Sequence, residues 1–114
     1  MPSGIALKGL TGNTSPVHSA TEWSLPTQQA DGSWKPGAWV AARAGQKIEY
    51  RRNGIHVCGC DQLPYWRGHL KGRAMDVYVC EFRGAVSIGP HGFAAREVRL
   101  LRPWDGVEEV WSCE

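Results

Sequence analysis

His56, Cys58 and Cys60 stand on alternate positions in the stretch GIHVCGC, and all three residue types can bind a metal or take part in nucleophilic chemistry. Alternate residues of a strand point to the same face, so these side chains could project side by side. Cys58, Cys60 and Cys80, with His56 or Cys113 as the fourth ligand, would supply the nitrogen and sulfur ligands of a tetrahedral zinc site. The C-x-C spacing differs from the C-x2-4-C spacing of structural zinc sites, so we expect buried free thiols and no bound metal.

A Cys-His catalytic pair is the alternative chemistry of this stretch. Cys60 precedes Asp61 at a possible helix start, where a helix terminus favours the thiolate, and His56 or His69 could act as its base. The carboxylate of Asp61 opposes a thiolate at that place. We therefore expect His56 to be a half-buried imidazole satisfied by a backbone carbonyl, in a stretch that is first an architectural corner.

Strands are needed to position these side chains, and the sequence has several short β-branched and aromatic runs between Gly- and Pro-rich turns. The run MDVYVCEF is apolar on both faces and predicts a central strand. Asp61 and Pro64 predict one helical turn after the corner. The pattern predicts an α+β fold that is mostly β, a small twisted sheet with one or two short helices. The expected strands are 5–10, 38–42, 54–58, 75–82, 85–89 and 94–104.

Length and composition are typical of one globular domain covering residues 1–114, with 42% hydrophobic and 21% charged residues. We expect an irregular arm at 11–37, which contains two tryptophans, and an acidic end at 105–114. No apolar run reaches the length of a membrane span, and the first residues lack a signal-peptide pattern. These features predict a cytoplasmic protein without membrane contact.

Six tryptophans are many for a core of this size, so they either staple loops to the sheet or form a surface that docks a partner. The expected partner is a host or cellular protein, and the oligomeric state stays open. A net charge of +2 is too small to indicate nucleic-acid binding, although base stacking beside arginines would suit a single strand. The candidate partner-binding residues are Trp66 with Arg67 and Arg73, Trp23 with Trp34, and Arg51 with Arg52.

Several segments together resemble a family of small uncharacterised proteins found in actinobacteria and their phages. The resemblance is carried, in this order, by KGL, EWSLP, GAWV, RNGIHVCGCDQLPYW, VYVCEFRG and REVRLLRPW, and it covers about Lys8 to Trp104. It implies a phage or actinobacterial accessory protein. Together with the tryptophans, this favours a binding module for a host or cellular macromolecule, without a cofactor.

A fainter similarity is to ADP-ribosyltransferases of the rifampin-modifying kind, which also begin with a short strand. It implies an NAD-dependent transferase as the alternative function. In that family the first strand carries a His that holds NAD, and Lys8 stands at the corresponding place here. The resemblance adds His56 and Glu81 as candidate catalytic residues, since a carboxylate can stabilise an oxocarbenium-like transition state.

Overall fold

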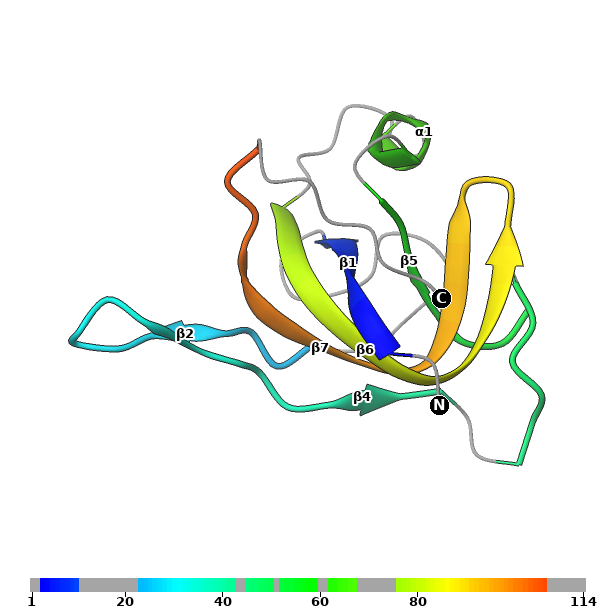
Figure 1. Cartoon of the computed structure of the whole chain (residues 1–114), viewed down its shortest axis with the longest axis horizontal. Coiled ribbons are helices and arrows are strands. Elements are labelled where there is room, and N and C mark those ends of the chain that lie inside the picture. Colours follow the sequence, from blue (N-terminus) through cyan, green and yellow to red (C-terminus); the bar gives the residue numbers. More distant parts are fainter. Residues whose placement is uncertain are drawn as a thin grey trace.

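The computed structural model describes residues 3–10, 23–42, 45–50, 52–59, 62–67 and 76–106. These residues form antiparallel strands and one five-residue helix, α1 (Leu63–Arg67), as Figure 1 shows. The prediction of an α+β fold with mostly strand and little helix is confirmed.

The centre of the sheet is a long hairpin formed by β6 (Asp76–Gly89) and β7 (Gly92–Pro103). The first strand, β1 (Ser3–Leu10), pairs with the other edge of β6. Residues 76–82 of the run MDVYVCEF therefore lie in an interior strand, as predicted, and Met75 lies outside the described residues. The run AVSIG was expected to be a separate strand, but it is the second half of β6, because the chain continues through a bend without a turn.

β6 and β7 curve strongly along their length (Figure 1). The pairing register shifts between Arg83 and Val86, where Gly84 adopts a φ of +88°, a left-handed conformation that favours glycine. The curvature brings the chain after β5 (Ile55–Val57) back to β1. Leu7 and Cys58 exchange backbone hydrogen bonds of 2.8 and 3.0 Å there.

The other edge of β7 pairs with two short strands. β5 lies opposite residues 93–95, and β4 (Val40–Ala41) lies opposite residues 97–98. Both fall inside the expected strands 54–58 and 38–42 but are shorter. β5 and β4 therefore share one edge of β7, and each covers part of it.

The second part of the predicted irregular arm is a small hairpin that projects from the sheet (Figure 1). In it, β2 (Thr27–Gln28) pairs with β3 (Trp34–Lys35). The Asp31 carboxylate closes the turn, because it accepts hydrogen bonds from the Ser33 backbone N–H at 3.0 Å and the Ser33 hydroxyl at 2.6 Å. These bonds lower the pKa of Asp31. Residues 11–22 of the arm lie outside the described residues.

Two hydrophobic clusters lie on the two faces of the sheet. In the inner cluster the rings of Phe82 and Phe93 meet edge to face with centroids 4.7 Å apart. The outer cluster includes Leu7 and Val79, and Leu63 of α1 packs into it. The other buried members of the inner cluster are Ala6, Leu10, Trp23, Val57, Cys80, Ala95, Val98 and Leu100.

Candidate functional site

Lys8 lies inside the molecule and is only 8% exposed. It is on the same face of β1 as Ala6 and Leu10, which belong to the inner cluster. Its Nζ donates a 2.8 Å hydrogen bond to the backbone carbonyl oxygen of His56 and lies 5.8 Å from the ring centroid of Trp23. The lysine therefore joins β1 to β5 through the interior.

Burial lowers the pKa of Lys8 to about 8, while the nearby thiols of Cys80 and Cys58 act in the opposite direction. Burial also raises the pKa of Cys80, so this thiol stays protonated at neutral pH. Cys58 and Cys80 are buried and form no disulfide, as predicted for structural thiols. An amine with a lowered pKa can act as a nucleophile or base, but this one is enclosed by the inner cluster.

The candidate catalytic residues Lys8 and Glu81 point to opposite faces of the sheet. In the β1 and β6 pair, Lys8 lies opposite Tyr78, whereas Glu81 lies opposite Ile5, and side chains alternate between faces along each strand. The Glu81 carboxylate accepts a 2.8 Å hydrogen bond from Arg99. Lys8 and Glu81 therefore do not line one cleft.

His56, the third candidate, is half-buried on β5, as expected for the corner. Its ring lies 5.3 Å from the ring of Tyr50, centroid to centroid. The group of His56 that accepts the hydrogen bond from Lys8 is its backbone carbonyl. The structure thus gives His56 a role in the corner, where its backbone links β5 to Lys8 of β1.

The predicted surface of Trp23 with Trp34 is not formed. Trp23 is 4% exposed and packs in the inner cluster, because the chain at the base of the arm folds against the sheet. Trp34 is half-buried on β3. Trp23 therefore fixes a loop to the sheet, which was the alternative interpretation of the tryptophans.

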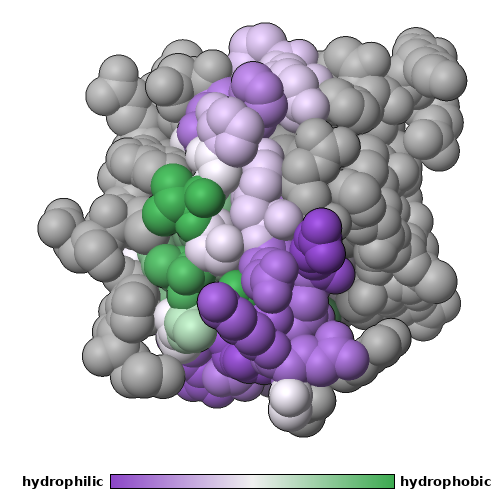
Figure 2. All heavy atoms as spheres, turned by 90° about the vertical axis from the view of Figure 1, so that its right-hand side faces the viewer, coloured by the Kyte–Doolittle hydropathy of each residue, from purple (hydrophilic) through white to green (hydrophobic). Residues whose placement is uncertain are grey.

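Arg52 is exposed and borders a hollow in the surface. Hydrophilic side chains gather in the lower middle of the face shown in Figure 2. The 45–50 segment, which supplies part of the hollow, is fixed to β6 by Tyr50, whose backbone N–H donates a 2.9 Å hydrogen bond to the Ser87 hydroxyl. Glu49 partly balances the charges of Arg52 and Lys47 there. The hollow is lined by Gln46, Lys47, Glu49, Arg52 and Asn53.

Other predictions fall outside the described residues. These are the partner-binding roles of Arg51 and Arg73, those of the Trp66 and Arg67 side chains, the chemistry of Cys60, Cys113 and the candidate base His69, and most of the acidic end at 105–114. The corner helix itself is present as α1, next to a hydrogen bond of 2.9 Å from the Gly59 backbone N–H to the Gln62 side chain.

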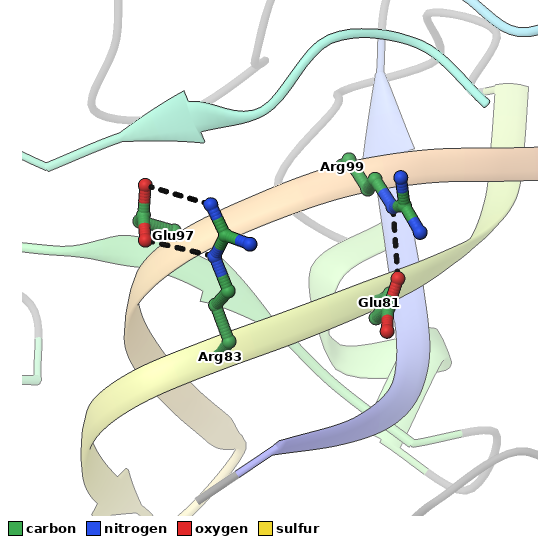
Figure 3. Close-up of polar contacts among 4 residues, drawn as sticks. All are labelled: Glu81, Arg83, Glu97 and Arg99. Atoms are coloured by element: carbon green, nitrogen blue, oxygen red, sulfur yellow. Dashed lines mark hydrogen bonds and ion pairs between the residues drawn. The ribbon is translucent and has the colours of Figure 1, made fainter. Parts of the chain in front are cut away.

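Trp39 stacks on two arginines on the outer face of the sheet. Its ring centroid lies 3.8 Å from the guanidinium carbon of Arg83 and 4.9 Å from that of Arg99. A carboxylate on the neighbouring strand holds each guanidinium, as Figure 3 shows. Nε of Arg83 is 2.9 Å from Glu97, and Nε of Arg99 is 2.8 Å from Glu81. We call these five residues the Trp39 face.

The Trp39 face is accessible and preorganised. The side chains of Arg83 and Glu97 are 48% and 32% exposed, and those of Arg99 and Glu81 are both 33% exposed. The stacking and the ion pairs hold the planar groups in place before any partner arrives, which reduces the entropy lost on binding.

The sequence interpretation did not select Trp39, Arg83 or Arg99, although a signal for two of them exists. The triplets EFR at 81–83 and EVR at 97–99 repeat a Glu-x-Arg pattern in two successive strands. In an antiparallel pair the second triplet runs in reverse, so each Glu can face an Arg. The register between β6 and β7 decides the pairing, and in the structure it places Glu81 opposite Arg99 and Arg83 opposite Glu97.

Comparison of the chain with protein-family models, curated proteins and solved structures gave no match. Among the residues that the structure describes, no group of three His, Cys, Asp or Glu side chains could hold a metal ion. None of the helical structure described is long and apolar enough to cross a membrane. The Trp39 face is the candidate site because of its own geometry.

Proposed function

We propose that the protein is a small binding module that docks a protein partner on the Trp39 face. The observation that supports this proposal is the stack of Trp39 on Arg83 and Arg99, half-exposed and fixed by ion pairs. Trp and Arg are the residues most enriched at binding hot spots. In line with the sequence resemblance, we propose that the module serves as an accessory protein of an actinobacterium or its phage.

The charges of the Trp39 face favour a protein over a nucleic acid as partner. Two arginines are paired with two glutamates, so the four charges cancel. Binding to a phosphate backbone depends on cations that can neutralise phosphates, and these guanidiniums are already neutralised. A protein partner with polar and aromatic groups fits a balanced surface better.

The alternative, an NAD-dependent transferase, lacks comparable support. Its candidate residues Lys8 and Glu81 lie on opposite faces of the sheet, and Glu81 is engaged by Arg99. A transferase would need these groups to converge on a bound NAD.

Photo-crosslinking tests the proposal. A benzophenone amino acid is placed at Ala41, an exposed residue of β4 opposite Glu97, and in a control chain at Ala30, which is exposed in the arm. Both chains are irradiated in an extract of the cells that produce the protein. We expect a discrete protein adduct from position 41 and none from position 30.

The matched variants are Trp39→Ala, which removes the stack, and Lys35→Ala, which changes an exposed residue of the arm. The adduct should disappear with Trp39→Ala and persist with Lys35→Ala, while thermal melting shows that both variants fold. An adduct that survives Trp39→Ala in a folded chain would overturn the proposal. Binding of a fluorescent single-stranded oligonucleotide that Trp39→Ala abolishes would favour the nucleic-acid alternative instead.

A further inference from the structure

The charges of the Trp39 face alternate in two directions. Across the strands, Glu81 lies opposite Arg99, and Arg83 lies opposite Glu97. Along β6 the order is negative then positive, and the same holds along β7, which runs the other way. Figure 3 shows the resulting two-by-two arrangement, with each charge next to charges of opposite sign.

This arrangement is complementary to itself. If two copies meet face to face about a two-fold axis parallel to the strands, β6 of each copy lies over β7 of the other. Glu81 then faces Arg99 of the second copy, and Arg83 faces Glu97 of the second copy. Every facing pair is attractive, which is the condition for an isologous interface between identical chains.

We infer that the Trp39 face binds a second copy of this chain and forms a two-fold dimer. The inference rests on the proposed function in taking this face as a docking surface, and it names the occupant. Trp39 supplies apolar area to the same face, since its ring centroid lies 3.8 Å from the guanidinium carbon of Arg83 and 4.9 Å from that of Arg99. Another protein partner on the same face would compete with the dimer.

The dimer is weak. The strands that carry the face curve strongly (Figure 1), so we expect two such faces to touch over a small area around the four charges and Trp39. A stable interface usually buries about 800 Å² on each partner, and we expect a contact limited to five residues to bury less. We expect a monomer at low concentration and a dimer as the concentration approaches about 1 mM.

Charge reversals test the dimer and its axis in sedimentation experiments. Arg83→Glu places like charges across the interface, and so does Glu97→Arg, so each variant alone should dimerise at least about tenfold more weakly than the parent chain. In an equal mixture of the two variants, all facing pairs are attractive again. The mixture should recover a dimer of parental affinity, detected as a heterodimer when one chain carries a mass tag.

The double variant Arg83→Glu with Glu97→Arg guards against a folding defect, because it restores the ion pair within the chain. If the two-fold axis is parallel to the strands, each reversed charge of the double variant still faces a charge of opposite sign on the second copy. The double variant should therefore dimerise like the parent chain. Lys35→Glu, on the exposed arm, should leave dimerisation unchanged.

A parent chain that remains monomeric at about 1 mM would overturn the inference, and so would a mixture of folded reversal variants without a heterodimer. If the parent chain is monomeric but position 41 still crosslinks to another protein in a manner that depends on Trp39, the dimer fails and the proposed function stands. If neither occurs, both fail.

Discussion

The ammonium group of Lys8 donates a 2.8 Å hydrogen bond to the backbone carbonyl oxygen of His56, and this bond joins the first strand to a strand 48 residues away. A lysine in this position couples the stability of the fold to pH. Its buried surroundings favour the neutral amine, and the carbonyl that accepts its hydrogen bond belongs to His56 in the corner.

We expect Lys8 to make the free energy of unfolding rise between pH 8 and pH 10.5. The pKa of Lys8 is about 8 in the folded chain and has its ordinary value of 10.5 in the unfolded chain. In this window the unfolded chain binds more protons, so stability increases with pH. Across the window the contribution is about 3 kcal/mol.

Urea unfolding of the parent chain and Lys8→Met at several pH values measures this contribution. The raised pKa values of Cys80 and Tyr78 act in the opposite direction at alkaline pH, but both chains contain these groups. The difference in unfolding free energy, parent minus variant, should therefore rise from pH 8 to pH 10.5. A difference that stays constant would show that the amine is solvated in the folded chain.

Val79→Asp should unfold the domain. Val79 is fully buried on β6, between β1 and β7, and an aspartate there would place an unpaired charge in the outer cluster. The expected loss exceeds about 4 kcal/mol, comparable to the whole stability of a small domain. Thermal melting provides the measurement, with Ala85→Asp on an exposed position of the same strand as the control. Similar melting temperatures for the two variants would contradict the interior placement.

Cys80 should resist alkylation in the folded protein. Its side chain is fully buried, and burial raises its pKa, so the reactive thiolate is scarce and shielded. The tryptic peptide from Ala74 to Arg83 contains this cysteine alone, so mass spectrometry can follow it separately. Iodoacetamide should modify the peptide in guanidinium but not under native conditions. Rapid native modification would place Cys80 at the surface.

Gly89→Ala should destabilise the fold by about 2 kcal/mol through overpacking. A Cβ at this position would collide with the ring of Tyr50, which fixes the 45–50 segment to the tip of the β6 and β7 hairpin. The added cost should vanish when Tyr50→Ala removes the ring, so the two substitutions together should cost less than the sum of the single ones. Urea unfolding of the two single variants and the double variant gives the coupling, and strict additivity would count against the contact.

The sequence by itself determined the strands that have a strong local pattern. The run MDVYVCEF is β-branched and aromatic on both faces, and the structure places its residues 76–82 between two neighbouring strands. Ile55 and Val57 alternate with His56, and the apolar pair packs with the inner cluster as the alternation predicts. These features depend on side-chain periodicity, which is local.

The tertiary structure alone decided where Lys8 and Trp39 lie. The transferase resemblance implied that Lys8 of LKGL lines an NAD site, but the structure buries this lysine inside the curved sheet. Trp39 meets Arg83 only because β4 pairs with β7 in one register and β7 pairs with β6 in another. Registers between strands distant in sequence follow from the packing of the whole core, so no local pattern could bring these residues together.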